Sequence, residues 1–256
     1  MSFVVIIPAR YASSRLPGKP LLMLAGKSMI QHVYENAVSS GASAVYIATD
    51  DTRIEEHARD FTDNVIMTRD DHACGTDRLA EAAEKLALDP DTIIVNLQGD
   101  EPLMPAENIR QVADLLDTHE SANMATLCIR IHDIDEIHNP HVVKTLFDKN
   151  GYAMYFSRAP IPYDRDAFTT GEREPAVGHE YYRHLGIYAY RCRFLKTYVQ
   201  WPSCLIEQRE SLEQLRVLWH GERIALTEAS ATPGPGIDTE DDAKTVSKLL
   251  GDSSKE

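Results

Sequence analysis

The chain has 256 residues, of which 43% are hydrophobic and 26% charged, and this composition is typical of a globular protein that can bury a core of its own. No apolar stretch approaches the roughly 20 residues of a membrane-spanning helix, and the opening run at residues 3–7 lacks the flanks of a signal peptide, so we expect a soluble, cytoplasmic protein without membrane insertion. The net charge of −14 argues against a nucleic-acid partner, because contacts with phosphates dominate that affinity.

The apolar pattern predicts strands and helices in alternation. Continuous apolar, β-branched runs at residues 3–7, 45–48 and 93–97 are typical of strands that are buried on both faces. Further strands are predicted at residues 64–67, 123–131 and 142–148, and an edge strand at 224–228. Helical spacing predicts helices over residues 28–41, from 52, over 76–88, from 105, over 207–220 and over 239–250. Short connections favour a doubly wound, mostly parallel α/β sheet in one domain, 1–250, with a frayed tail, 251–256.

This alternation is interrupted between about residues 152 and 191. Strand-like pieces at 152–156 and 185–190 flank a polar loop at 162–178 that contains proline and glycine. We interpret the stretch as an inserted antiparallel element that acts as a lid or in dimerisation.

The loop that follows the first predicted strand, residues 9–20, is rich in cations and hydroxyl groups. It contains Arg10, Arg15 and Lys19 together with two serines and a glycine, and it has no acid. Ligands of an open α/β sheet bind beyond the carboxyl ends of the strands, and this mixture of donors suits a triphosphate. An exposed basic loop is the alternative. Neither a G-x-G-x-x-G motif nor a complete P-loop is present, since Leu21 stands where the P-loop motif requires glycine.

Two aspartates follow predicted strands or precede the last helix. Asp100 comes after the strand at 93–97 and next to Gly99, which suits a magnesium ligand, although turns also favour aspartate. Asp238 raises the same question more weakly, because it could equally cap the last helix. The residues alone leave both alternatives open.

The cysteines and histidines show no ligand spacing. The four cysteines include no C-x-x-C pair, which favours reduced, packed thiols over disulfides or zinc ligands. Three histidines lie close together in the sequence, but their spacing matches no helical pair of ligands: His132, His138 and His141.

Several motifs resemble those of the 3-deoxy-D-manno-octulosonate (Kdo) cytidylyltransferases, the CMP-Kdo synthetase family. The resemblance extends in order over nearly the whole chain and rests on P-A-R-Y-A-S-S-R-L-P-G-K-P (8–20), I-A-T-D-D (47–51), C-G-T-D-R (74–78), V-N-L-Q-G-D-E-P (95–102), F-S-R-A-P-I-P (156–162), R-H-L-G-I-Y (183–188), L-E-Q-L-R-V-L (212–218) and G-I-D-T (236–239). It implies a fold of the nucleotide-diphospho-sugar transferase type, a homodimer, and the reaction of CTP with Kdo to give CMP-Kdo and pyrophosphate, which activates the sugar for lipopolysaccharide assembly.

The resemblance also implies roles for single residues. The loop that holds the CTP phosphates matches Ala9, Arg10, Ser13, Arg15, Gly18 and Lys19. Positions near the cytosine and the reacting centre match Arg78 and Gln98. The carboxylates that hold Mg²⁺ match Asp100 and Asp238, which with Lys19 and Arg10 form the implied catalytic set. The pocket for the sugar acid matches Arg158, His184, Tyr188, Glu213 and Gln214.

The chain departs from the family pattern at a few positions. Ser14 and Asp77 replace threonine and glutamate, Tyr163 replaces tryptophan, and the loop at 166–178 is longer. Because the last two changes lie on the sugar side, 8-amino-Kdo or a sialic acid remains an alternative substrate, and a non-catalytic protein that binds nucleotide sugars is a second alternative. In the expected mechanism the anomeric 2-hydroxyl of the sugar attacks the α-phosphorus of CTP. No residue is identified as a general base.

Overall fold

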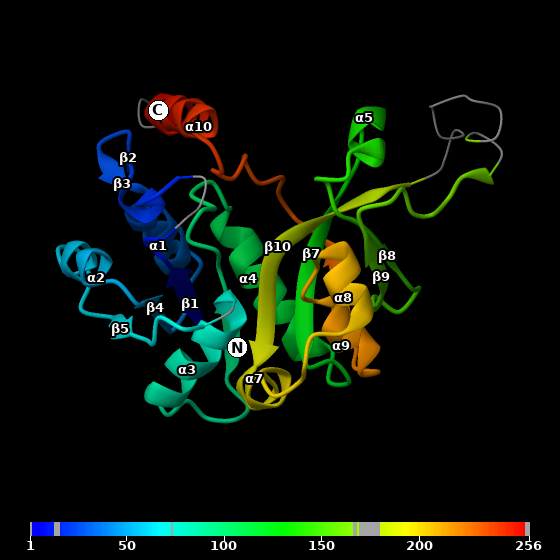
Figure 1. Ribbon diagram of the computed structural model, residues 1–256, viewed down its shortest axis with the longest axis horizontal. Helices are drawn as coiled ribbons and strands as arrows, with labels where there is room; N and C mark the ends of the chain where they lie inside the picture. Colours follow the sequence, from blue (N-terminus) through cyan, green and yellow to red (C-terminus); the bar gives the residue numbers. More distant parts are fainter. Residues whose placement is uncertain (1, 13–15, 73, 166–167, 169–179, 254–256) are drawn as a thin grey trace.

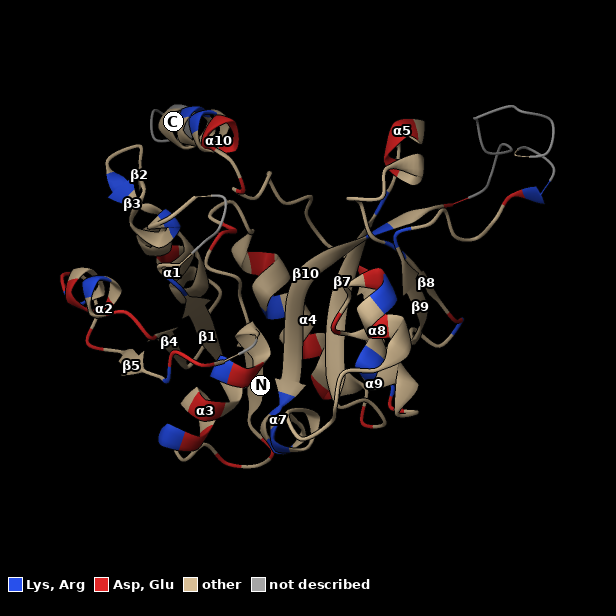
Figure 2. Ribbon diagram, in the orientation of Figure 1, with Lys and Arg blue, Asp and Glu red and all other residues tan. Residues whose placement is uncertain are grey.

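The computed structural model describes residues 2–12, 16–72, 74–165, 168 and 180–253, and its centre is a nine-stranded sheet (Figure 1). The strand order along the main path is β11-β7-β10-β6-β1-β4-β5, and β8 and β9 are attached through β10. Helices cover both faces of this sheet, as expected for a doubly wound fold. Figure 2 shows acidic and basic residues interspersed on these helices.

The first half of the sheet is parallel, as the sequence predicted. Strand β1 (Phe3–Ala9) is buried along its whole length and pairs in parallel with β4 (Ala44–Thr49) on one side and β6 (Ile93–Asn96) on the other. The short strand β5 (Val65–Met67) extends the parallel run beyond β4. The loops that follow β1 and β6 therefore leave neighbouring strands at the same edge of the sheet.

The second half of the sheet differs from the sequence interpretation. Strand β10 (Tyr182–Arg191) lies between β6 and β7 (Met124–Arg130) and is antiparallel to both. The antiparallel direction expected for this stretch is confirmed, but β10 is a central strand of the main sheet and not part of an inserted piece. The physical reason is its two-sided burial, since Ile187 packs in the core on one face and Tyr190 in the core on the other. The predicted edge strand is confirmed as β11 (Ile224–Glu228), which pairs in parallel with β7.

A smaller antiparallel hairpin remains of the predicted insertion. Strands β8 (Lys144–Phe147) and β9 (Ala153–Ser157) pair with each other, and β8 also pairs with the start of β10 (Figure 1, right). The long loop predicted at 166–178 lies outside the described residues except for Phe168.

Most of the helices begin and end close to the predicted positions. Helices α1 (Met29–Ser39), α2 (Thr52–Ala58) and α4 (Ala106–Thr118) cover one face of the sheet, and α3 (Gly75–Lys85) packs against the other. Ser28 caps α1 as expected, because its hydroxyl accepts a hydrogen bond from the Gln31 amide at 3.3 Å. The last helix, α10 (Glu240–Ser253), continues three residues into the tail that was expected to fray, and residues 254–256 lie outside the described part of the chain.

The single helix predicted at residues 207–220 is wrong. The structure has two short helices, α8 (Leu205–Glu210) and α9 (Leu215–Trp219), separated by a turn in which Ser211 adopts a left-handed conformation with φ of 52°. Arg158 explains the break, since its guanidinium donates hydrogen bonds to the backbone carbonyls of Glu210 and Ser211. Those carbonyls would otherwise accept hydrogen bonds within a continuous helix.

Several short elements were not predicted. They are the 3₁₀ helix η1 (Lys19–Leu21), the hairpin of β2 (Met23–Leu24) and β3 (Lys27–Ser28), and helices α5 (Ile134–His138) and α7 (Cys192–Tyr198). Within the described residues, no helix combines the length and the apolar character needed to span a bilayer.

Candidate functional site

Three predicted residues from distant parts of the sequence meet at one edge of the sheet. The ammonium of Lys19 lies 2.7 Å from Oδ2 of Asp100 and 3.2 Å from Oδ1 of Asp238. The Lys19 side chain is 9% exposed, whereas those of Asp100 and Asp238 are 42% and 52% exposed. A buried ammonium therefore joins two carboxylates whose other surfaces face solvent.

A glycine allows the chain to bring Lys19 into this position. Gly18 has φ of +72° and starts the turn η1, and its amide donates a hydrogen bond to the carbonyl of Tyr11. A Cβ at this position would lie only 3.2 Å from the Tyr11 ring. Both the left-handed backbone and the close approach therefore require glycine.

The loop that carries Asp100 packs tightly against the first strand. A Cβ on Gly99 would lie 3.0 Å from the carbonyl oxygen of Pro8, so a side chain there would push the loop away from β1. On its other side the Asp100 carbonyl accepts a hydrogen bond from the Ile237 amide at 3.1 Å. Backbone contacts thus fix the two aspartate-bearing loops to each other.

Asp238 does not cap the last helix. Thr239 does so instead: its hydroxyl accepts from the Asp242 amide, while the Asp242 carboxylate accepts from the Thr239 amide. This reciprocal capping box leaves the Asp238 carboxylate directed at Lys19. Ile237, directly before Asp238, packs with α10 against Leu24 of the β2–β3 hairpin, which follows Lys19 in the chain. One small apolar cluster therefore anchors the segments that carry Asp238 and Lys19.

Asp100 and Asp238 together carry more negative charge than the Lys19 ammonium between them neutralises. Glu101 adds a third acid beside Asp100, and its burial, together with the neighbouring Asp100 carboxylate, raises the pKa of Glu101 to about 7. No group of three or more metal-binding side chains occurs in the described part of the chain. Two oxygen ligands from the protein, completed by substrate phosphates, are what Mg²⁺ commonly uses, so Asp100 and Asp238 fit this ion.

The described part of the predicted phosphate loop lies at the same edge. Ala9 ends β1, and the guanidinium of Arg10 directly after it donates a hydrogen bond to the backbone carbonyl of His72 at 2.8 Å. Ser13 and Arg15 lie outside the described residues.

The two residues predicted near the cytosine occupy different environments. Gln98 follows β6 and lies beside the start of α3, where its amide donates to Asn96 at 3.4 Å. Arg78 is fully buried, and its guanidinium binds Asp50 and Thr68. Arg78 therefore ties α3 to the residues that follow β4 and β5, at the same edge of the sheet as Gln98.

Four of the five residues predicted for the sugar side lie on β10 and the α8–α9 turn. His184 and Tyr188 project from β10 with ring centroids 5.4 Å apart, and burial lowers the pKa of His184 to about 3 and raises that of Tyr188. Glu213 accepts a hydrogen bond from the Thr76 hydroxyl at 2.9 Å, so this turn is joined to the start of α3. The side-chain nitrogen of Gln214 is buried with no hydrogen-bond partner among the described residues.

The hydrogen bonds of Thr126 define the tautomer of His184. Two backbone carbonyls compete for the single hydroxyl proton of Thr126, that of Ile187 at 2.8 Å and that of Leu185 at 3.1 Å, and we therefore assign the proton to a carbonyl. The hydroxyl oxygen must then accept from Nε2 of His184, which lies 3.0 Å away. Neutral His184 consequently presents Nδ1 as an acceptor.

Arg158, the fifth sugar-side residue, binds backbone carbonyls. Its guanidinium donates to Glu210 at 2.7 Å, to Pro140 at 2.9 Å and to Ser211 at 3.5 Å. Arg158 thus fixes the α8–α9 turn through its backbone carbonyls.

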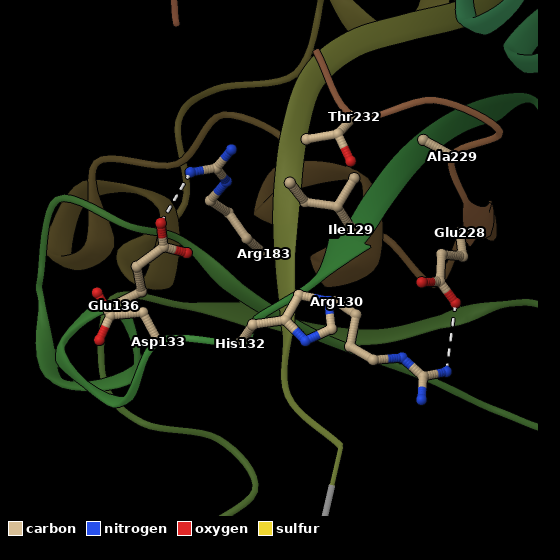
Figure 3. A pocket seen from close by; sticks show the side chains of 9 residues that line it. All are labelled: Ile129, Arg130, His132, Asp133, Glu136, Arg183, Glu228, Ala229 and Thr232. Atoms are coloured by element: carbon tan, nitrogen blue, oxygen red, sulfur yellow. Dashed lines mark hydrogen bonds and ion pairs between the residues drawn. The ribbon is translucent and has the colours of Figure 1, made fainter. Parts of the chain in front are cut away.

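A cavity of about 270 Å³ lies where β7 and β11 end and β10 begins (Figure 3). Its charges pair with one another, since Arg183 contacts Glu136 at 3.3 Å and Arg130 contacts Glu228 at 3.4 Å. None of the predicted site residues lines this cavity, and its internal pairing does not favour a triphosphate.

Comparisons with known proteins agree with the motifs. The model of the family described as Cytidylyltransferase matches residues 4–224. The chain belongs to the cytidylyltransferase family. A protein named 3-deoxy-manno-octulosonate cytidylyltransferase from Idiomarina loihiensis is 56% identical over 98% of this chain and 100% of its own length, and one from Hahella chejuensis is 53% identical over 99% of each. The family resemblance predicted from the motifs is confirmed.

Solved structures of cytidylyltransferases also match this chain. CMP:2-keto-3-deoxy-manno-octonic acid synthetase complexed with CTP has a TM-score of 0.90 and 43% identity, over 99% of this chain and 100% of that one. A cytidylyltransferase from Leptospira borgpetersenii has a TM-score of 0.62 at 17% identity, over 98% of this chain and 87% of that one, and shows the fold alone.

Some residues that contact the predicted site residues were missed by the sequence analysis. Thr76 lies within the motif at residues 74–78, and its hydroxyl was the available signal. Thr126 and His72 carry no local signal, because their contacts with His184 and Arg10 join segments 58 and 62 residues apart.

Proposed function

We propose that this cytidylyltransferase transfers CMP from CTP to Kdo, giving CMP-Kdo and pyrophosphate, and that the product serves lipopolysaccharide assembly. The observation that carries the proposal is the contact of Lys19 with Asp100 and Asp238 at the strand ends where ligands of this fold class bind. The names of the full-length relatives and the CTP complex of the similar structure support the same substrates.

In the proposed mechanism the 2-hydroxyl of Kdo attacks the α-phosphorus of CTP, and pyrophosphate leaves. Arg10 and Lys19 stabilise the phosphates, because phosphoryl transfer depends mainly on positioning and electrostatics. We propose Mg²⁺ as the cofactor, held by Asp100 and Asp238, and when bound it neutralises developing charge and favours ionisation of the attacking hydroxyl.

On the sugar side the chain supplies hydrogen-bonding groups of fixed orientation. Neutral His184 offers Nδ1 as an acceptor, and Tyr188 remains a phenol because burial raises its pKa. Gln214 offers a buried side-chain NH₂ group that donates no hydrogen bond to any described residue. Such groups discriminate hydroxylated substrates strongly, because a poorly matched sugar would leave them unpaired.

We also propose a homodimer in the cytoplasm. The exposed apolar side chains of Met154, Leu205 and Trp219 lie on β9, α8 and α9, which pack together and form one candidate interface. The cysteines in the structure are free, which fits a reducing compartment.

The direct test is product identification by mass spectrometry after incubation with CTP, Mg²⁺ and one sugar acid at a time. We expect CMP-Kdo and pyrophosphate with Kdo. If a product forms only with 8-amino-Kdo or a sialic acid, that sugar acid and not Kdo is the acceptor substrate. CTP binding in calorimetry without any product would instead favour a non-catalytic binding protein.

A further inference from the structure

The segment between β5 and α3 presents a backbone carbonyl to the nucleotide side. The carbonyl oxygen of His72 accepts a hydrogen bond from Nη2 of Arg10 at 2.8 Å. His72 itself is buried, with 9% of its surface exposed. The direction of the Arg10 guanidinium therefore depends on where this segment places its carbonyl.

A single side chain from α3 holds this segment at both ends. The carboxylate of Glu81 accepts the Arg69 amide at 3.2 and 3.3 Å, and it also contacts Nε2 of His72. The two residues between them, Asp70 and Asp71, are exposed. Glu81 thus fixes the start and the end of a four-residue segment whose middle projects into solvent.

Glu81 is in turn held by a cation and kept charged. Lys85, one turn further along α3, lies 2.8 Å from Oε1 of Glu81 and donates to the Met67 carbonyl at the end of β5. Although burial acts to raise the pKa of Glu81, hydrogen bonds from Lys85 and His72 lower it to about 2. An ionised carboxylate is a pure acceptor, so it can accept from all of these donors at once.

We propose that Glu81 is a positioning residue for CTP, because it fixes the segment at 69–72 and thereby aims the guanidinium of Arg10 at the phosphates. This inference rests on the proposed role of Arg10 in binding CTP. In the described contacts Glu81 touches neither Arg10 nor the proposed metal ligands Asp100 and Asp238. Its effect therefore passes through the His72 backbone.

The test is the affinity for CTP of Glu81→Gln, measured by calorimetry, together with steady-state kinetics of the full-length enzyme. Glutamine keeps the shape but directs an NH₂ group at donors. We expect Kd and KM for CTP to rise roughly 10- to 100-fold, the effect of losing one charge-assisted contact, with KM for Kdo unchanged. Glu84→Gln is the matched control, because Glu84 is exposed on the next turn of the same helix. The affinity of this variant for CTP should equal that of wild type.

A double-mutant cycle separates positioning from general loosening of the fold. In an Arg10→Ala background, Glu81→Gln should cause no further loss of CTP affinity, because its target is gone. His72→Leu keeps the carbonyl but removes the contact with Glu81. It should lower CTP affinity on its own and cause no further loss in the Arg10→Ala background. It takes the place of Glu81→Gln if that variant does not fold by circular dichroism.

Three results would overturn the inference. They are unchanged CTP affinity in Glu81→Gln, or in His72→Leu where that variant stands in, an equal effect with and without Arg10, and a rise in KM for Kdo of the same size. If Arg10→Ala itself leaves CTP affinity unchanged, the role of Arg10 in the proposed function fails together with the inference. Additive losses would overturn the inference alone.

Discussion

At the scale of single residues, the proposed chemistry depends on carboxylates that share one cation. Asp100→Asn removes half of the negative charge that two aspartates offer to a metal ion. We expect kcat to fall by ~10²–10³ or more while the fold stays intact, as when a well-aimed electrostatic group is lost from an active site. Pyrophosphate release at saturating Mg²⁺ measures this effect. Asp117→Asn, on the exposed surface of α4, is the control, and full activity of Asp100→Asn would exclude the metal assignment.

Burial of His184 predicts a pH dependence of stability. Its pKa is lowered by burial from 6.5 to about 3, so between these values the unfolded chain binds a proton that the folded protein does not. The free energy of unfolding should therefore fall as the pH drops below 6.5, by about 1.4 kcal/mol per pH unit from this residue at most.

Urea unfolding at several values between pH 7 and pH 4.5 checks this prediction. In His184→Gln, whose amide does not titrate, the decline should be shallower than in wild type by that contribution. Parallel pH curves for the two proteins would show that His184 does not take part.

At the scale of elements, the turn between α8 and α9 is under local backbone strain. Ser211 has φ of 52°, a conformation that costs most residues but not glycine. Ser211→Gly should raise the free energy of unfolding by about 0.5–1 kcal/mol. Denaturant titration measures the change, and Ser39→Gly, within the helical backbone of α1, should lower stability by about 0.5 kcal/mol. Equal effects of the two substitutions would contradict this account of the turn.

The same turn shows where prediction from the sequence ended. Apolar periodicity was enough for β1, β4, β6, α1, α3 and α4, because each of these elements buries a face that its own residues define. The break at Ser211 depends on Arg158, which is 53 residues away in the sequence and competes for the carbonyls of a continuous helix. The place of β10 between β6 and β7 likewise depends on which partners are available for its two edges.

In the candidate site, too, some contacts could be predicted from the sequence and others could not. Motifs predicted Lys19, Asp100 and Asp238, whose side chains meet directly. Contacts that pass through a backbone carbonyl, such as that of His72, leave no trace in residue type, because every residue has a carbonyl.

At the scale of the whole molecule, the proposed dimer can be tested by surface substitution. Leu205 is 60% exposed on α8, which packs against the helix α9 that carries Trp219, and Leu205→Glu would place a charge on the proposed interface. We expect wild type to sediment as a dimer and Leu205→Glu as a monomer of 28.7 kDa in analytical ultracentrifugation. Leu249→Glu on α10, far from this surface in Figure 1, should remain dimeric. A wild-type protein that sediments as a monomer would refute the dimer.

The central position of β10 has a consequence for how new acceptor specificities can arise. Tyr188 stands opposite Asn96 in the ladder between β10 and β6, and Gln98 and Asp100 follow directly after β6. Hydrogen bonds within one sheet therefore set the distance between the proposed sugar pocket on β10 and the proposed CTP site after β6. In the proposed site, side chains on β10 and on the α8–α9 turn can change to admit another sugar acid without altering that distance. Exchange of a few such side chains between relatives should thus alter the acceptor and leave the choice of nucleotide intact.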